Sequence, residues 1–184
     1  MDEQVLLWIN QGCAHPLLDE LFWWVSQRTW FSAPLSIALL CYSIFRFRWH
    51  GMLFFFLLAV TVIVSNSFGD VLKNIFSEPR PCQIIFEQLR GPNNAILGPC
   101  GYSMNGMPSN HAINFCAAAT FVAFTTSWRV WKVYLFFITV LVCLSRIYLG
   151  KHYPSQVLVG SGIGGAVGWL CAVIVRAIFP KLRY

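Results

Sequence analysis

Three short segments of this sequence carry polar residues whose types and spacing could support chemistry. They are the stretch Lys73–Pro81, the tetrapeptide Pro108–His111 and the stretch Ser145–His152. Each lies beside or within a strongly apolar run, where polar groups are energetically expensive and are usually retained for a function. Together they supply three cations and two histidines, a set of side chains suited to phosphate chemistry.

The three cations are Lys73, Arg80 and Arg146. Together they can neutralise a bound phosphate and the charge of its transition state. Arg146 is the most informative, because it interrupts an apolar run and no Asp or Glu occurs after residue 87 to pair with it. An uncompensated buried charge is costly, so an anionic ligand is the favoured partner. Taken alone, Lys73 and Arg80 are equally consistent with interfacial side chains whose charged ends reach water.

The second segment places Ser109 where it can cap the N-terminus of the following helix. The free amides and the positive dipole end of such a helix form a ready anion site, and His111 falls in its first turn. Taken alone, this segment is more simply explained as a helix cap followed by an incidental histidine. His152 closes the third segment, and the two histidines can divide the roles of nucleophile and general acid.

The sequence shows no ligand set for a metal ion. It has no cluster of Asp and Glu of the kind that holds Mg²⁺, and no clustered Cys and His residues of the kind that holds zinc. We therefore expect phosphoryl transfer that needs neither a metal ion nor another cofactor.

The composition indicates the class of protein whose elements position these residues. Hydrophobic residues make up 57% of the 184 residues and charged residues 11%, whereas about 25% of a soluble domain is charged. These values exclude a soluble enzyme and a disordered chain. The basic residues are scattered, so no nucleic-acid-binding surface is expected either. An integral membrane protein remains, and the sequence identifies no protein partner for it.

Five stretches can cross a bilayer, which takes about 20 residues per helix. The expected fold is all-α, a polytopic membrane helical bundle with about five transmembrane helices in a single domain over residues 1–184. Residues 1–28 are expected to form helices in the membrane interface, residues 29–76 the first two spans, residues 77–108 a loop and residues 109–184 the last three spans. The spans themselves are expected at 29–45, 51–76, 110–128, 131–149 and 155–177. Tryptophans at headgroup level are expected to be Trp8, Trp23, Trp24 and Trp30.

Under this topology the three polar segments fall on one side of the membrane. That side carries three basic residues besides the three cations singled out above, and the other side carries seven. Cytoplasmic loops are enriched in Lys and Arg. We therefore expect the 77–108 loop and the histidines to lie outside the cytoplasm.

In order and spacing, the three segments resemble the signature of the type 2 phosphatidic acid phosphatase superfamily. That signature is Lys-x6-Arg-Pro, Pro-Ser-Gly-His and Ser-Arg-x5-His-x3-Asp, and its counterpart here spans residues 73–156. The resemblance implies that His152 attacks phosphorus and forms a phosphohistidine, while His111 protonates the leaving group and then helps to activate water. It also implies a set of groups that hold the phosphate oxygens: Lys73, Arg80, Ser109, Arg146 and a backbone amide near Asn110.

The resemblance implies a lipid phosphate or diphosphate as substrate and a site near one membrane surface. With the Lys and Arg distribution, we expect hydrolysis at the outer face of the cytoplasmic (inner) membrane. Undecaprenyl diphosphate, phosphatidylglycerol phosphate and lipid A 1-phosphate are all compatible with the motifs. One alternative is a lipid phosphotransferase that uses the same histidine with an acceptor other than water. A second alternative is a non-catalytic membrane anion-binding protein, for which both histidines would be dispensable.

This sequence departs from the family signature at two positions. Asn110 stands where the signature has Gly, so its side chain could crowd a phosphate that approaches the backbone. Gln156 stands where the signature has the Asp that orients the nucleophilic histidine. A glutamine can offer its carbonyl oxygen to Nδ1–H of His152, but it brings no negative charge to stabilise an imidazolium. A weakened or differently tuned nucleophile is therefore expected.

Three further patterns predict structure rather than chemistry. Gly160, Gly164 and Gly168 recur every four residues within the last span, which is typical of a close helix-packing face. Cys82 and Cys100 both lie in the long loop, where an oxidising compartment would allow them to form a disulfide. Asp70 lies one turn before Lys73 and is expected to pair with it.

Overall fold

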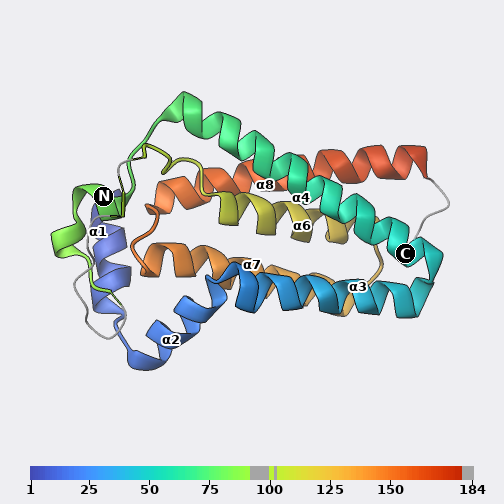
Figure 1. The fold of residues 1–184 in the computed structure, drawn as a ribbon, viewed down its shortest axis with the longest axis horizontal. Helices are drawn as coiled ribbons and strands as arrows, with labels where there is room; N and C mark the ends of the chain where they lie inside the picture. The colour runs from blue at the N-terminus through green and yellow to red at the C-terminus, as the bar shows by residue number, and fades with distance from the viewer. Residues whose placement is uncertain (92–99, 102, 180–184) are drawn as a thin grey trace.

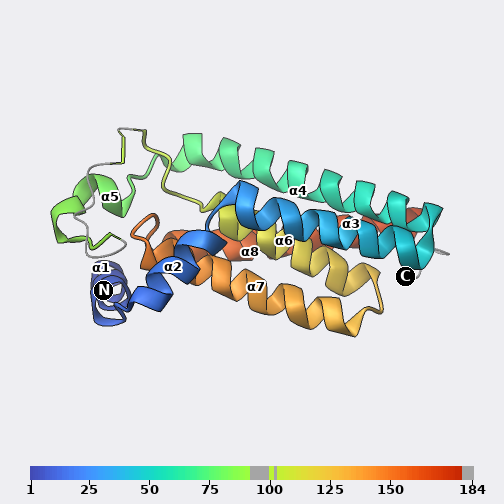
Figure 2. The ribbon, with the colours of Figure 1, turned by 60° about the horizontal axis from the view of Figure 1, so that its bottom comes forward.

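The computed structural model describes residues 1–91, 100–101 and 103–179. Five long helices run along the molecule and form a bundle (Figure 1): α3 (Ala33–Phe47), α4 (Trp49–Phe76), α6 (Asn110–Thr125), α7 (Arg129–Tyr148) and α8 (Pro154–Ile178). Shorter elements gather at the end of the bundle where the N-terminus lies (Figure 2): α1 (Asp2–Leu7), a π-helical turn at Trp8–Gly12, α2 (Pro16–Val25), α5 (Pro81–Ile84) and a 3-10 turn at Phe86–Gln88. A second π-helical turn, Arg28–Ser32, leads into α3.

Four of the helical segments are long and apolar enough to cross a membrane, namely Trp30–Phe47, α4, α7 and α8. Their outer faces carry large apolar side chains, and Phe56, Phe136 and Leu158 are each more than 60% exposed. Apolar surface of this extent is stable only against lipid or another apolar partner. The chain is a multi-pass membrane protein, and the prediction of an all-α membrane bundle is confirmed.

The predicted third span differs from the other four. It was expected over residues 110–128, but α6 ends at Thr125 and has 16 residues, fewer than the about 20 that span a bilayer. This helix lies inside the bundle, where Ala112, Ile113, Ala117 and Phe121 are completely inaccessible. The structure therefore uses α6 as a central helix that is covered by its neighbours.

The most extensive helix contact in the bundle joins α6 to α8. A Cβ atom on Gly160, Gly164 or Gly168 would lie within 2.8 Å of a backbone carbonyl oxygen of α6 or of its N-cap residue. Only glycine allows the two backbones to approach this closely. We call this contact the glycine seam, and it confirms the packing face predicted from the four-residue spacing.

The N-terminal helices pack against the end of the bundle. Leu6 is completely buried in a cluster that includes Cys82 and Val157. Asp19 accepts hydrogen bonds of 2.5 and 2.8 Å from the guanidinium group of Arg90 in the long loop, and a third of 2.5 Å from the Tyr148 hydroxyl at the end of α7. Three parts of the chain that are distant in sequence are thereby joined at one point.

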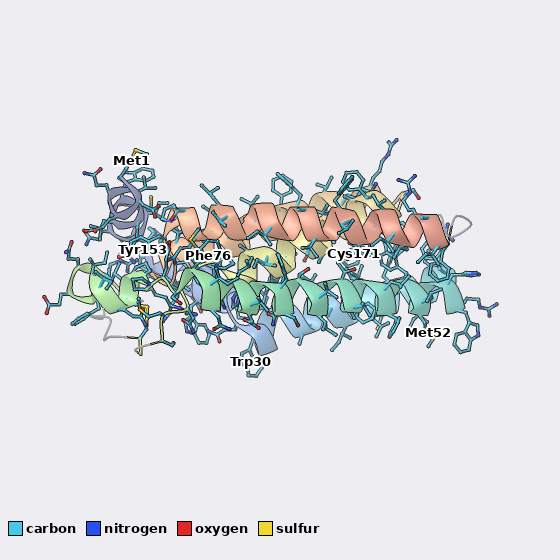
Figure 3. All side chains as sticks on the ribbon, turned by 90° about the horizontal axis from the view of Figure 1, so that it is seen from above. Met1, Trp30, Met52, Phe76, Tyr153 and Cys171 are labelled. Atoms are coloured by element: carbon cyan, nitrogen blue, oxygen red, sulfur yellow. A yellow bond between two sulfur atoms is a disulfide. The ribbon has the colours of Figure 1, made fainter. Side chains whose placement is uncertain are left out.

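The tryptophans of this region are accessible at the surface. Trp8 and Trp30 are each 67% exposed, and Trp23 and Trp24 about half exposed. Trp30 projects away from the bundle in the view from above (Figure 3). This placement is compatible with the expected headgroup-level positions.

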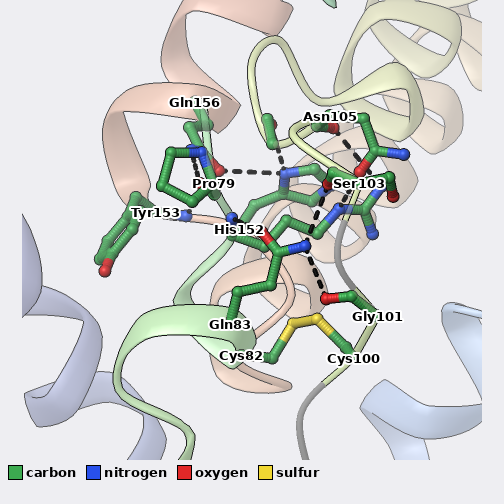
Figure 4. The surroundings of a disulfide bond; sticks show 12 residues. Pro79, Cys82, Gln83, Cys100, Gly101, Ser103, Asn105, His152, Tyr153 and Gln156 are labelled. Atoms are coloured by element: carbon green, nitrogen blue, oxygen red, sulfur yellow. Dashed lines mark hydrogen bonds between the residues drawn. A yellow bond between two sulfur atoms is a disulfide. The ribbon is translucent and has the colours of Figure 1, made fainter. Parts of the chain in front are cut away.

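The loop between α4 and α6 folds back on itself. A disulfide joins Cys82 to Cys100, as the sequence suggested. Beside it, Nε2 of Gln83 donates to the carbonyl oxygens of Gly101 at 2.9 Å and Ser103 at 3.0 Å (Figure 4). The returning residues 100–101 and 103–106 are thus held against residues 78–83, which begin the loop.

Candidate active site

His152 lies in the turn between α7 and α8 and is only 2% exposed. Its backbone N–H and that of Lys151 both donate to the carbonyl oxygen of Arg146, which folds the chain back at the end of α7. The turn requires a positive φ of 62° at Gly150, a conformation that favours glycine. The imidazole is thereby fixed at one end of the bundle.

The Nδ1 atom of His152 lies 2.8 Å from the carbonyl oxygen of Gly106 and 3.3 Å from Oε1 of Gln156 (Figure 4). Both neighbours are hydrogen-bond acceptors, so Nδ1 carries the proton of the neutral ring. Nε2 then keeps its lone pair, which is the state that a nucleophilic histidine needs.

The orientation of the Gln156 amide is fixed by its other contacts. Oε1 accepts a hydrogen bond from the backbone N–H of Tyr153 at 3.2 Å, while Nε2 donates to the carbonyl oxygen of Pro79 at 2.9 Å. Nε2 also lies 3.4 Å from a carboxylate oxygen of Glu78. The amide oxygen therefore faces the histidine, as the sequence led us to expect.

Sequence reasoning missed three residues of the loop. Gly106 supplies the shorter of the two acceptors for His152, and Asn105 accepts a hydrogen bond of 2.9 Å from Nε of Arg80. Glu78 accepts a backbone hydrogen bond of 2.7 Å from the N–H of Gly106 and touches Gln156 through its carboxylate. None of the three belongs to a recognisable motif, and Gly106 is 46 residues away from the histidine it contacts.

Two arginines surround His152 with positive charge. Burial lowers the pKa of His152 well below its usual value, and the charges of Arg146 and Arg80 lower it further. Burial, followed by the same two arginines, also lowers the pKa of Lys151. Arg146 is 8% exposed, and its guanidinium donates to the hydroxyl of Ser26. This concentration of cations around a neutral imidazole favours an anionic ligand.

Ser109 occupies the N-cap position of α6, but its side chain makes no capping hydrogen bond, so the expected cap is not formed. Its backbone N–H instead donates to the carbonyl oxygen of Gln156 at 3.1 Å, which joins the N-terminus of α6 to α8. The hydroxyl is completely buried and has no hydrogen-bond partner among the described residues. A buried polar atom of this kind is expected to find a partner when a ligand is bound.

The Asn110 side chain is directed towards α4. Its Nδ2 donates to Asp70 at 2.7 Å and to Asn66 at 3.2 Å. A Cβ atom on Gly69 would lie 2.6 Å from the Asn110 side-chain oxygen, so α4 and α6 pack closely at this point. Nζ of Lys73 lies 3.6 Å from Asp70, which confirms the predicted ion pair. Lys73 and Asn110 therefore share one carboxylate.

His111 lines a groove of about 640 Å³ between α3 and α4, with α6 as its floor. Near His111 the groove is polar and includes Asn66, Ser67 and Asn114. The rest of its wall is mostly apolar, with Leu35, Leu39, Phe55, Leu58, Val62 and Phe115 among the lining residues.

The sequence-predicted site residues thus form two groups. His152, Gln156, Arg80 and Arg146 gather around the α7–α8 turn. Lys73, Asn110 and His111 belong to the α4–α6 side, with its asparagines and its groove. Ser109 connects the groups through its backbone bond to α8. Across the described part of the chain, no three His, Cys, Asp or Glu side chains are grouped closely enough to hold a metal ion.

The fold and the site define a multi-pass membrane protein with a neutral histidine in a cationic end of its helical bundle. The sequence profile of the PAP2 superfamily matches residues 52–180, and the chain belongs to this superfamily. The resemblance recognised from the three motifs is therefore confirmed.

Three known proteins illustrate the similarity. Lipid A 4'-phosphatase of Bacteroides thetaiotaomicron is 27% identical over 193 residues, which cover this whole chain and 80% of that protein. Dolichyldiphosphatase of Saccharomyces cerevisiae is 32% identical over 139 residues, which cover 66% of this chain and 55% of that protein. The crystal structure of Aquifex aeolicus LpxE matches with a TM-score of 0.66 at 25% identity, over 91% of this chain and 92% of that one. The first two relatives are named phosphatases, which agrees with the enzyme class expected from the sequence.

Proposed function

We propose that this protein is a lipid phosphate phosphatase that works without a metal ion, through a phosphohistidine on His152. The observation that carries the proposal is the anchoring of Nδ1 of His152 by two acceptors, which leaves the lone pair of Nε2 available. The low pKa of this histidine keeps it neutral, and therefore nucleophilic, at neutral pH. Arg80 and Arg146 supply positive charge beside it.

In the first step, Nε2 of His152 forms a bond to phosphorus as the bond from phosphorus to the leaving oxygen breaks. His111 donates a proton to that oxygen. In the second step His111 takes a proton from water, the water oxygen attacks phosphorus, and the N–P bond breaks to release inorganic phosphate. Lys73, Arg80, Arg146, the Ser109 hydroxyl and the backbone amide of Asn110 hold the phosphate oxygens in both steps.

A lipid substrate is supported by the groove that His111 lines. It is mostly apolar, lies between two membrane-spanning helices and becomes polar near His111. An acyl or prenyl chain would bury apolar surface there, which contributes about 25 cal/mol per Å². The headgroup would then lie towards the polar end.

A phosphorylated lipid A is the substrate we place first, because a relative that aligns with the whole chain is named a lipid A 4'-phosphatase. The dolichyldiphosphatase relative supports a polyprenyl diphosphate, such as undecaprenyl diphosphate, as the next candidate. Phosphatidylglycerol phosphate completes the set expected from the motifs.

We place the protein in the cytoplasmic (inner) membrane, with the whole chain as one phosphatase domain and the site facing outwards. The Cys82–Cys100 disulfide supports this orientation, because disulfides persist in oxidising compartments outside the cytoplasm. The excess of Lys and Arg on the opposite side of the predicted topology supports the same direction.

The test is phosphate release by the detergent-purified protein in EDTA, with phosphorylated lipid A, undecaprenyl diphosphate and phosphatidylglycerol phosphate as substrates. We expect His152→Ala to lower the rate by at least about 10³-fold, because it removes the nucleophile. His50→Ala is the matched control, since His50 is exposed at the start of α4, the opposite end of that helix from Lys73.

Brief reaction with ³²P-labelled substrate, followed by denaturation, should leave an acid-labile label on the wild type and none on His152→Ala. Transfer of the label to a lipid acceptor in place of free phosphate would instead identify a phosphotransferase. Release that persists in His152→Ala would overturn the proposed role of this histidine.

A further inference from the structure

His152 lacks the carboxylate partner that the family signature supplies. The family signature has an Asp at the position of Gln156, and a carboxylate there would touch Nδ1 of the nucleophilic histidine directly. Gln156 provides an acceptor at 3.3 Å but no charge. On its other side, however, its amide nitrogen lies 3.4 Å from the carboxylate of Glu78.

We propose that Glu78 is a positioning residue for His152, and that its negative charge acts on the imidazole through the Gln156 amide. The inference rests on the proposed phosphohistidine mechanism and adds a residue to it. In this arrangement Nδ1–H of His152 donates to Oε1 of Gln156, and Nε2–H of Gln156 donates to Glu78. No proton has to leave the amide, because its role is to hold the imidazole and the carboxylate in line.

The backbone around Glu78 reinforces this arrangement. The Glu78 carbonyl oxygen accepts from the N–H of Gly106 at 2.7 Å, and the Gly106 carbonyl oxygen is the closer acceptor for His152 at 2.8 Å. The next carbonyl, that of Pro79, accepts from Gln156 at 2.9 Å. The dipeptide Glu78–Pro79 thus holds both hydrogen-bond acceptors of His152, the Gly106 carbonyl and the Gln156 amide.

Gly106 makes this close assembly possible. A Cβ atom at this position would lie 2.5 Å from the Pro79 carbonyl oxygen and 2.7 Å from Nε2 of Gln156. Any side chain would therefore separate the loop from the amide. The loop therefore packs closely against Gln156 at the start of α8, and the contact of Glu78 with Gln156 is part of this packing.

The charge of Glu78 matters most when the imidazole becomes positive. Attack on phosphorus places positive charge on the His152 ring, and the charges of the nearby Arg146 and Arg80 oppose it. The carboxylate of Glu78 is the negative group in contact with the amide that touches the ring. Its removal should disfavour the charged ring, both in the reaction and on protonation.

The variant Glu78→Gln removes the charge and keeps the size and the hydrogen-bonding capacity of the side chain. We expect kcat to fall about tenfold with little change in KM, since outer partners of active-site groups typically contribute 10- to 100-fold. The acid limb of the kcat profile should move to lower pH, because loss of a nearby negative charge lowers the pKa of a histidine. Glu87→Gln is the matched control, since Glu87 is an exposed carboxylate of the same loop.

A double-mutant cycle gives the sharper test. In the Glu78→Gln background, Gln156→Asp should raise kcat, because it places a carboxylate directly at Nδ1. In the wild-type background the same change brings two carboxylates together, so its benefit should be smaller or reversed. Unequal effects in the two backgrounds would establish the coupling between the two positions.

The proposal is overturned if Glu78→Gln has the kcat and the pH profile of the wild type while His152→Ala is inactive. It is also overturned if Glu87→Gln loses as much activity as Glu78→Gln. If Glu78→Gln does not fold, Glu78→Ala, which also removes the charge, replaces it, and a fall in kcat with an unmoved acid limb then counts against the inference. Absence of phosphate release by the wild type on every lipid would instead contradict the proposed function itself.

Discussion

Two regions of this molecule hold the candidate site together by opposite means. In the glycine seam, α6 and α8 fit because side chains are missing, and the backbones touch directly. At the end of the bundle, residues 78–83, 100–101 and 103–106 form what we call the loop cage around His152 and Gln156. It is held by hydrogen bonds and one disulfide. The seam depends on shape, whereas the cage depends on polar partners.

The two regions contribute different parts of the site. The seam fixes the N-terminus of α6 relative to that of α8, and the bond from Ser109 N–H to the Gln156 carbonyl lies directly at its end. The cage brings the Gly106 carbonyl to His152 and holds Arg80 through the Asn105 side-chain oxygen. Damage to the seam should therefore unfold the protein, and damage to the cage should mainly impair catalysis.

The largest effect is expected from Gly164→Leu in the glycine seam. Its Cβ atom alone would lie 2.2 Å from the Ile113 carbonyl oxygen, and backbone cannot move aside cheaply. Overpacking of this kind typically costs about 1–3 kcal/mol and occasionally more, so a marked fall in the thermal unfolding midpoint in detergent is expected. Gly162→Leu is the control, since no atom lies within 4 Å of a Cβ there. Equal unfolding midpoints for the two variants would contradict the seam.

Loss of the disulfide should have the next largest effect, a fall in catalytic rate caused by a loosened cage. The double variant Cys82→Ser/Cys100→Ser opens a link across 18 positions, which is worth up to about 3 kcal/mol to the closed loop. We expect kcat to fall about tenfold, with a smaller change in the unfolding midpoint than Gly164→Leu gives. Cys41→Ser, at an exposed free cysteine of α3, controls for loss of a thiol. Unchanged kcat in the double variant would show that the cage does not need the link.

The smallest effect is expected at Asn110, whose side chain could, from the sequence alone, crowd a bound phosphate. Asn110→Gly restores the family residue and removes the bonds to Asp70 and Asn66. Because the Asn110 side chain is directed to α4, phosphate release should change less than about threefold, while the loss of its hydrogen bonds lowers stability by about 1 kcal/mol. Asn114→Ala removes a neighbouring bond to Asn66 and serves as the comparison. A rate gain above tenfold would mean that Asn110 does obstruct the phosphate.

The two regions also differ in how far the sequence could predict them. Gly160, Gly164 and Gly168 have a regular spacing, so a helical period is enough to place them on one face. The cysteines of the loop and the Asp70–Lys73 pair were predictable for similar local reasons. The glycines and the Asp70–Lys73 pair are recognised from residue types a few positions apart in one helix. The two cysteines are recognised because they lie in the same loop.

The hydrogen bonds of the cage were not predictable, unlike its disulfide, because the main acceptor for His152 is a backbone carbonyl. Every residue has such a group, and nothing in the sequence marks that of Gly106 as the one that reaches an imidazole 46 residues away. The end of α6 at Thr125 was missed for a related reason. No charged residue occurs between Ala112 and Trp128, so nothing in the sequence marks the point after Thr125 where the helix ends.

The disulfide has a consequence for when the molecule becomes active. In the proposed orientation the chain enters the membrane with reduced thiols, and the cage closes only after oxidation on the far side. A copy inserted in the opposite sense would keep its cysteines reduced, and its cage would lack the link. The covalent bond would then act as a check on topology, restricting full catalytic rate to molecules that face the correct compartment.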